Sequence, residues 1–230
     1  MSVVLYNRYM DYEIIVEKLY KLSDEKYRVF SKSLANTPLI VIGVRIPKIK
    51  ELAKELKKEN LNRFVFAQYL EADIFYGLWV NQQKINDLEK LIKLEEALSK
   101  ASSWPITDTI ICNTKFKDLD LVFSYYIKWT KESDNEFLCR SGYLLYMKYF
   151  SKNKGSIQGF LKNITESKYY YVNMMVARTL ATVAISFENE IFEYLKNSNN
   201  ISIIKKYTIR KINESFRINN CAKMKFLSIK

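Results

Sequence analysis

Apolar residues recur three and four positions apart along most of this 230-residue chain, which is the spacing of one face of an α-helix. Ile14, Ile15, Leu19 and Leu22 show this pattern near the start of the chain. Only five glycines and three prolines are present, too few for the turns of a many-stranded β-fold. Strand-like alternation of polar and apolar residues is nowhere sustained. The sequence therefore predicts an all-α fold.

The expected helices are short and amphipathic, and brief polar breaks separate them. No long linker rich in Ser or Gly divides the chain, so we expect a single domain over 1–230. Helix pairs of about 35 to 45 residues are the size of HEAT-type units, which bury their apolar faces by stacking. We therefore expect a curved solenoid of about six antiparallel helix pairs, although an irregular helical bundle has the same periodicity. The expected helices after the first cover 47–56, 63–81, 84–99, 105–113, 118–131, 135–150, 156–163, 168–186, 188–196 and 201–216.

Basic residues outnumber acidic ones. The chain has 37 Lys and Arg against 25 Asp and Glu, a formal net charge of +12. The stretch 201–230 has eight cations and one acid, Glu214, and so carries +7 of this charge. Such an excess attracts polyanions, which makes nucleic acid or an anionic membrane surface the leading class of partner. An AT-rich genome would raise the Lys content without any such partner. Ile209, Ile212 and Phe216 have helical spacing, which indicates that part of this stretch is folded.

Several kinds of catalytic and cofactor site are excluded by composition. The chain has no His, so it has no Ser-His-Asp triad, no Cys-His pair and no HExxH zinc site. Its five glycines form neither a Walker loop nor a dinucleotide fingerprint. Cys112, Cys139 and Cys221 are too widely spaced for a zinc ribbon and are expected to be buried thiols. No metal or cofactor is implied, so any chemistry uses carboxylates, Tyr, Lys or the reactivity of the substrate.

No targeting or membrane segment is visible. Residues 1–17 contain the charged Arg8, Asp11 and Glu13 and no sustained apolar stretch, so we expect no signal peptide. Nowhere do 18 apolar residues run together without a charge. We expect a cytoplasmic protein that associates with the nucleoid and not with a membrane.

Four segments share their order and spacing with a known family. They are 43–47 with 49–54, then 103–108 with its Trp-x-x-x-Asp element, then 137–149, and finally 170–177 paired with 209–217. Together they resemble the AlkD-like family of bacterial DNA alkylation repair glycosylases, which are HEAT-like repeat proteins. The resemblance implies a concave basic groove that holds duplex DNA with alkylated bases and releases cationic 7-methylguanine and 3-methyladenine. It also implies that the protein binds the DNA backbone around the lesion and has no pocket for the base. We expect a monomer with no obligate protein partner.

The resemblance makes Asp108 and Trp104 the catalytic candidates. An N-alkylated purine is already cationic and leaves easily, so the developing positive charge on deoxyribose is what needs stabilisation. A carboxylate at Asp108 supplies this, and the indole face of Trp104, four residues earlier, attracts a cationic base. Pro105 favours a cap position for Trp104. Without the resemblance, Asp108 fits a carboxylate in a first helical turn and Trp104 fits a core residue.

Basic residues in the same segments are the DNA-binding candidates. Arg140 corresponds to an Arg in the DNA-binding groove of the family, and its planar guanidinium suits a phosphate or the Asp108 carboxylate. Lys148 is a second phosphate candidate, and either cation could instead be a solvated surface charge. Arg178 replaces the second Trp of catalytically competent members, which removes one aromatic wall and adds a cation that can hold a phosphate. The remaining candidates are Arg45, Arg210 and Lys211.

The sequence thus predicts a DNA glycosylase for alkylated purines and leaves two alternatives. Trp104, Asp108 and Arg140 favour the enzyme. Arg178 favours a catalytically silent HEAT-repeat protein that binds damaged or branched DNA. A scattered charge distribution would favour a third possibility, a protein-binding solenoid.

Overall fold

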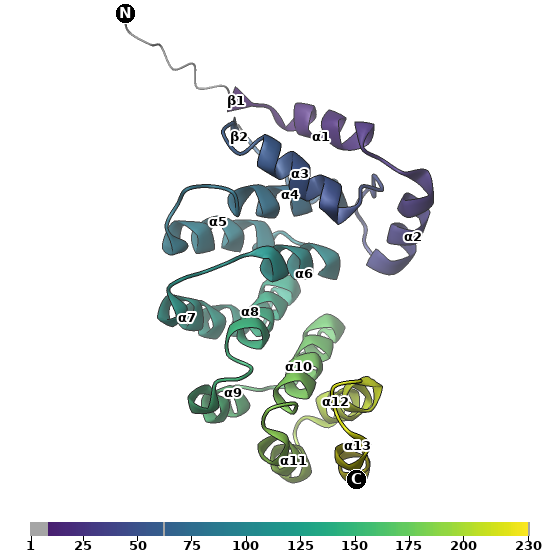
Figure 1. Ribbon diagram of the computed structural model, residues 1–230, viewed down its shortest axis with the longest axis vertical. Coiled ribbons are helices and arrows are strands. Elements are labelled where there is room, and N and C mark those ends of the chain that lie inside the picture. The colour runs from purple at the N-terminus through teal and green to yellow at the C-terminus, as the bar shows by residue number, and fades with distance from the viewer. Residues whose placement is uncertain (1–8, 62, 230) are drawn as a thin grey trace, which may run out of the picture. The chain divides into compact units, whose positions relative to one another are not determined.

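The computed structural model describes residues 9–61 and 63–229, which divide between Asp118 and Leu119 into two compact units, unit 1 and unit 2 (Figure 1). Within the described residues there are thirteen α-helices, one short 3₁₀ turn and two strands of two residues each. The predicted all-α fold is confirmed. Residues 1–8, on which the expected absence of a signal peptide partly depends, and Lys230 lie outside the described residues.

Unit 1 is built around one buried helix. Helix α4 packs against α1, α3, α5 and α6, and all of its residues are buried. The two strands pair in parallel, Tyr9 with Asn60 and Met10 with Leu61. The elements of this unit are β1 (Tyr9–Met10), α1 (Tyr12–Lys21), α2 (Glu25–Ala35), α3 (Ile46–Glu55), β2 (Asn60–Leu61), α4 (Leu70–Val80), α5 (Asp87–Ser99) and α6 (Trp104–Asn113).

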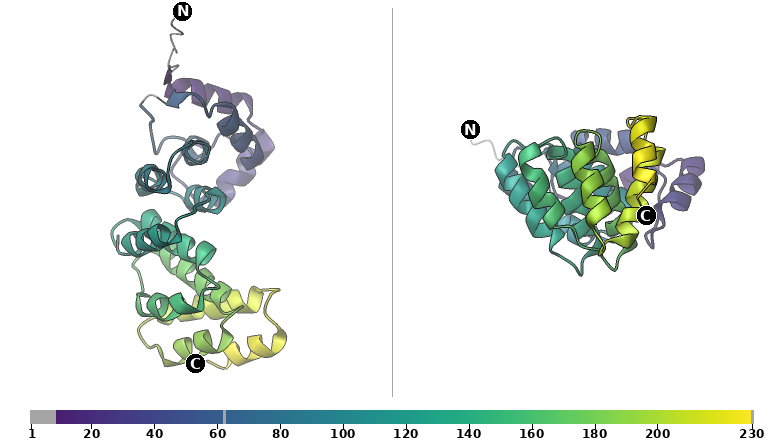
Figure 2. Two further views of the ribbon diagram at one scale, coloured as in Figure 1. Left: turned by 60° about the vertical axis from the view of Figure 1, so that its left-hand side comes forward. Right: turned by 90° about the horizontal axis from the view of Figure 1, so that it is seen from below.

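Unit 2 is a stack of helices in which α10 packs against α8, α11 and α12 (Figure 2). Helix α7 covers α8, and α13 contacts α12. Trp129, Tyr126 and Tyr146 are fully buried, and the Tyr146 ring stacks on Phe160 with centroids 4.1 Å apart. This is the stacking of neighbouring helices that a helical repeat requires. Its elements are α7 (Leu119–Thr130), α8 (Glu136–Tyr149), η1 (Lys154–Ser156), α9 (Ile157–Lys162), α10 (Tyr170–Val183), α11 (Glu188–Asn197), α12 (Ser202–Glu214) and α13 (Asn220–Leu227).

Two buried carboxylates hold the loops of unit 1. Glu71, 2% exposed, accepts hydrogen bonds from the backbone N–H groups of Ile42 and Gly43 at 2.8 and 2.7 Å. Gly43 has a φ of 92°, which favours glycine, and a Cβ there would lie 2.5 Å from Cβ of Arg28. Asp73, also 2% exposed, accepts from the N–H of Ala67 at 3.2 Å. These bonds fix the segments that lead into α3 and α4.

Most of the predicted helices match the structure to within a few residues, and the exceptions have physical causes. The helix expected over 63–81 begins only at Leu70, because Ala67 has a left-handed φ of 62° and Tyr69 forms a parallel bridge with Ile40. Helices α2 and α13 were not expected. Both bury few apolar residues: in α2 only Ala35 is buried, although Tyr27, Phe30 and Leu34 have helical spacing, and α13 is only eight residues long.

Two details of the sequence predictions are wrong. Phe216 does not belong to a helix, because α12 ends at Glu214. Cys112 and Cys221 are exposed, and only Cys139 is the expected buried thiol. Burial raises the pKa of Cys139 to about 12. None of the described helices combines the length and the apolar character needed to cross a membrane.

Candidate functional site

Helix α6 carries the two catalytic candidates on one side. Trp104 is its first residue, and Pro105 occupies the first turn, where a missing N–H costs nothing. The N-cap residue is Ser103, so the expectation that Trp104 is the cap was wrong by one position. Trp104 and Asp108 are four residues apart within one helix, and both are partly exposed. The helix therefore places the indole and the carboxylate on the same face.

The Trp104 side chain packs against α2. Its indole N–H donates to the carbonyl of Leu34 at 3.3 Å. The ring also lines a cavity of about 180 Å³, to which α2 contributes Tyr27, Phe30 and Leu34. The indole is thus oriented by α2 and keeps part of its surface open, unlike the fully buried Trp129.

Asp108 lies past the first turn of α6, which contains no acidic residue. The helix dipole acts mainly within the first turn, so stabilisation of the helix terminus is a weak explanation for this carboxylate. The hydroxyl of Thr107 donates to Asp108 at 3.3 Å and to the Trp104 carbonyl at 3.0 Å. Thr107 is buried and ties the Asp108 carboxylate to the backbone of the first turn of α6.

Arg45, the third candidate in unit 1, precedes α3 as its N-cap residue. Its guanidinium lies 3.3 Å from the Asp24 carboxylate and 4.7 Å from the centre of the Tyr27 ring. The side chain is 56% exposed, and exposed ion pairs of this kind contribute little to stability. A phosphate could therefore compete with Asp24 at small cost.

Arg140 in unit 2 is buried, which overturns its interpretation as a solvated surface charge. It is 6% exposed and donates to the carbonyl of Tyr171 at 2.8 Å. One helical turn earlier, Glu136 accepts from the N–H of the same Tyr171 at 3.0 Å. Two charged side chains of α8 thus hold one residue at the start of α10. Lys148, near the end of α8, is partly exposed and lies 5.1 Å from the Tyr149 ring.

The other candidates of unit 2 gather between α10 and α12. Arg178 is exposed on α10 and lines a cavity of about 230 Å³ together with Lys211 of α12. We call this the basic cavity; it is lined by Arg178, Ala181, Thr182, Lys211, Glu214, Ser215 and Arg217. Glu214 accepts from Arg210 at 2.8 Å and from Lys211 at 3.0 Å, and these bonds hold the pKa of Glu214 below its usual value.

Two features of this surface were missed in the sequence. Arg217 lines the basic cavity but follows the end of α12. Tyr170 is 55% exposed at the start of α10, and its ring lies 6.0 Å from that of Tyr207 on α12. Interleaved Tyr and Arg residues in 170–217 were the available signal, because aromatic rings and cations together are typical of nucleic-acid surfaces.

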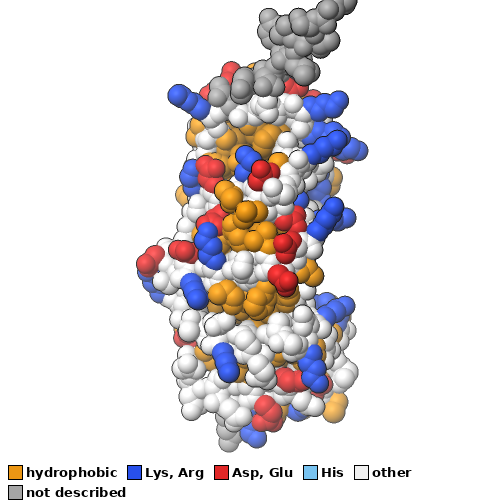
Figure 3. All heavy atoms as spheres, turned by 90° about the vertical axis from the view of Figure 1, so that its left-hand side faces the viewer, with side chains coloured by type: hydrophobic (Ala, Val, Ile, Leu, Met, Phe, Trp, Pro, Cys, Tyr) orange, Lys and Arg blue, Asp and Glu red, His pale blue; other side chains and the backbone are white. Residues whose placement is uncertain are grey.

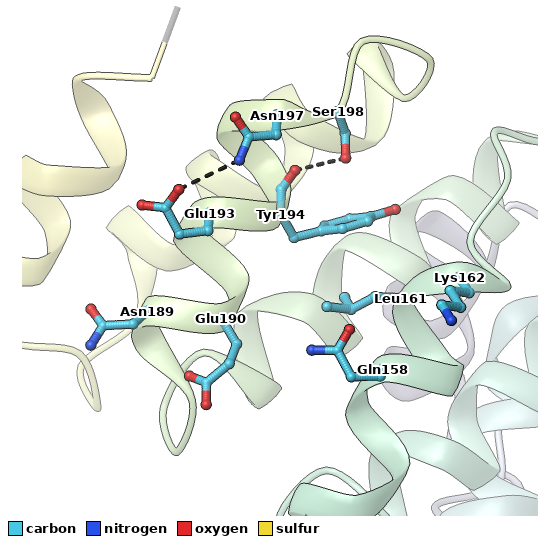
Figure 4. Close-up of a pocket in the computed structure, with 9 residues that line it drawn as sticks. All are labelled: Gln158, Leu161, Lys162, Asn189, Glu190, Glu193, Tyr194, Asn197 and Ser198. Atoms are coloured by element: carbon cyan, nitrogen blue, oxygen red, sulfur yellow. Dashed lines mark hydrogen bonds between the residues drawn. The ribbon is translucent and has the colours of Figure 1, made fainter.

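Other parts of the surface are less suited to a polyanion. Figure 3 shows a face on which acidic side chains lie among the basic ones and apolar patches occupy much of the centre, so no uniformly positive surface is present there. A larger cavity of about 610 Å³ lies between α9 and α11 (Figure 4). It presents Glu190 and Glu193 with one cation, Lys162. Among the described residues, no cluster of acidic and Cys side chains is arranged to hold a metal ion.

The site residues thus form two groups. Unit 1 holds Trp104 and Asp108 together on α6 and Arg45 at the start of α3, while unit 2 brings Arg178 and Lys211 to one cavity. A comparison with curated proteins finds no match to the chain. The model of the family described as DNA alkylation repair enzyme matches residues 15–212, which span both groups. The chain belongs to this family, and its general role is in DNA alkylation repair.

Proposed function

We propose that the protein is a DNA N-glycosylase that releases cationic N-alkylated purines, such as 7-methylguanine and 3-methyladenine, from duplex DNA. The observation that carries the proposal is the pairing of Trp104 and Asp108 on one partly exposed face of α6, within the part of the chain that matches the repair family. Both residues keep part of their surface exposed, so both side chains are accessible to a ligand.

The proposed chemistry assigns one task to each side chain. The positive charge of the alkylated base makes it a good leaving group, so bond cleavage needs little acid catalysis. Asp108 stabilises the positive charge that develops on deoxyribose and orients the attacking water. Trp104 faces the cation with its indole ring, an interaction of about 0.5 to 2 kcal/mol that grows with desolvation.

In this proposal, the basic side chains of both units bind the DNA. Arg178, Arg210 and Lys211 bind backbone phosphates from α10 and α12, while Arg45 contributes from α3. Arg140 supports them as a positioning residue, because its bond to Tyr171 fixes the start of the helix that carries Arg178. Lys148 adds a partly exposed ammonium. Such contacts bind duplex with little sequence preference and weaken steeply with salt.

The experiment is release of methylated purines from methylated duplex DNA by the purified protein, with freed bases separated by chromatography. Binding of the same duplex is measured in parallel by anisotropy. The proposal expects 7-methylguanine release above the spontaneous rate, in proportion to bound protein. Binding without release would refute the enzyme.

One observation favours a second candidate, a catalytically silent DNA-binding protein. Arg178 is exposed and shares the basic cavity with two further cations, so it is placed to hold an anion and to repel a cationic base. If the protein binds methylated duplex and releases no base, this second function replaces the first. Arg178→Trp discriminates further, because it should raise release only if a missing aromatic wall limits the enzyme.

A further inference from the structure

Phe216 is the most exposed large hydrophobic residue among the described residues. Its relative exposure is 104%, against 67% for Met224, the next in order. It lies in the turn between α12 and α13, outside the part of the chain that matches the family. A ring that contacts no other part of the fold gains nothing from folding, so its position calls for another explanation.

The turn that carries Phe216 is well anchored. Ile212 before it is fully buried, and Ile218 after it is 8% exposed. The N–H of Arg217 donates to the Ser215 hydroxyl at 3.2 Å, and Asn219 caps α13 by accepting from the N–H of Ala222 at 2.9 Å. The backbone therefore holds the ring outward in a defined place.

The basic cavity begins at the two neighbours of this ring. Ser215 and Arg217, on either side of Phe216 in the chain, both line it. Arg178, Lys211 and Arg217 bring three positive charges and Glu214 one negative charge, which leaves the cavity with a net charge of +2. The hydroxyl groups of Thr182 and Ser215 add hydrogen-bonding capacity. This chemistry fits one phosphate group.

We propose that Phe216 and the basic cavity form a binding site for one nucleotide of DNA whose base is unstacked: the cations hold its phosphate and the ring stacks on its base. Exposed aromatic rings beside cationic grooves bind single-stranded nucleic acid in this way. In an intact duplex both faces of each base are covered, so the ring can stack only at a gap, a bulge or a strand end. The inference rests on the proposed function in so far as DNA is the ligand.

The test uses Phe216→Trp as a reporter. Of the three native tryptophans, Trp79 and Trp129 are buried and Trp104 is partly exposed, and a new indole at the exposed position 216 adds a signal without disturbing the core. The probes are one covalently closed circular duplex, which has no strand ends, and the same circle with a single-nucleotide gap, each with an internal fluorescent label for anisotropy. Emission should fall when gapped duplex binds and stay constant when intact duplex binds. The wild-type protein reports any change from the native tryptophans.

Two truncations separate stacking from charge. Phe216→Ala should weaken binding of gapped duplex about tenfold, the loss expected for one base–aromatic stack, and leave intact duplex unaffected. Arg217→Ala should weaken both and lower the salt slope by about one contact. Lys152→Ala is the matched control for charge, because Lys152 is exposed in the turn after α8 and does not line the cavity. It should leave both affinities close to wild type.

The outcomes distinguish this inference from the proposed function. If the gapped duplex binds but the emission of Phe216→Trp is unchanged, or Phe216→Ala binds it as tightly as wild type, the stacking site is refuted and DNA binding stands. If neither duplex binds at low salt, the proposed DNA binding and the stacking site are both refuted. Base release that is absent while the emission still responds refutes only the glycosylase.

Discussion

Asp73 should make the stability of the protein depend on pH in an unusual direction. Its carboxyl group is 2% exposed in α4, and each oxygen lies 3.2 Å from the backbone nitrogen of Ala67. Burial raises the pKa of Asp73 from 3.8 to about 7, and the hydrogen bond from Ala67 opposes the rise only in part. Between these two pH values the folded protein retains a proton that the unfolded chain releases.

The free energy of unfolding should therefore fall as pH rises. The contribution of Asp73 is complete below about pH 4, where both states are protonated, and is lost as pH rises through about 7. A pKa rise from 3.8 to about 7 corresponds to a loss of up to about 4 kcal/mol by pH 8. Asp73→Asn stays neutral and keeps an oxygen for the N–H of Ala67. It should gain stability over wild type by up to this amount as pH rises from about 4 to 8.

In unit 2, an amide side chain makes the equivalent contact with a backbone N–H group. Asn173 in α10 accepts from the N–H of Ser167 and donates to its carbonyl, both at 2.8 Å, and Ser167 is six residues earlier, as Ala67 is from Asp73. The assay is urea unfolding followed by circular dichroism across this pH range. Asp120→Asn, at an exposed position in α7, controls for removal of a carboxylate. Parallel pH profiles for Asp73→Asn and wild type would show that the Asp73 carboxyl does not retain a proton in the folded protein.

Three further variants test the site and its supports. Glu71→Gln keeps one acceptor oxygen and turns an amide N–H₂ toward the N–H of either Ile42 or Gly43, so it should lower the unfolding free energy by about 1 to 3 kcal/mol; a neutral effect in urea unfolding would contradict the buried bonds. Arg140→Ala should lower both the melting temperature and DNA affinity, since the side chain is buried between helices, whereas unchanged melting would show that it supports no structure. Arg178→Ala should keep the melting temperature and lower the salt slope of DNA binding by about one contact; an unchanged slope would remove it from the interface.

The helices and the pair on α6 were predictable because their signals are local. Helical periodicity depends on residues three and four apart, and Pro105 marks the first turn of α6. The spacing of Trp104 and Asp108 then places them on one face without knowledge of any other part of the chain.

The buried polar contacts were harder to predict, because their partners are distant backbone groups. Arg140 donates a hydrogen bond to the carbonyl of Tyr171, 31 residues away, and the apolar residues that flank Arg140 in the sequence do not predict this bond. Glu71 and Asp73 are the two charges in the apolar run 70–80, which is a signal of buried carboxylates, but the sequence does not name their donors. Phe216 has helical spacing with Ile212, yet the backbone is extended at Ser215 (φ −77°, ψ 128°) and ends the helix first.

In the proposed mechanism, Asp108 acts on bond cleavage and not on DNA binding. The most direct test of this role is the single-turnover rate of 7-methylguanine release from methylated duplex at saturating protein, compared between wild type and Asp108→Asn, with Asp120→Asn as control. Asp108→Asn should bind the duplex at least as tightly as wild type and release the base about 10²-fold more slowly, while Asp120→Asn should match wild type. Equal rates of release by wild type and Asp108→Asn at equal occupancy would show that Asp108 has no role in bond cleavage.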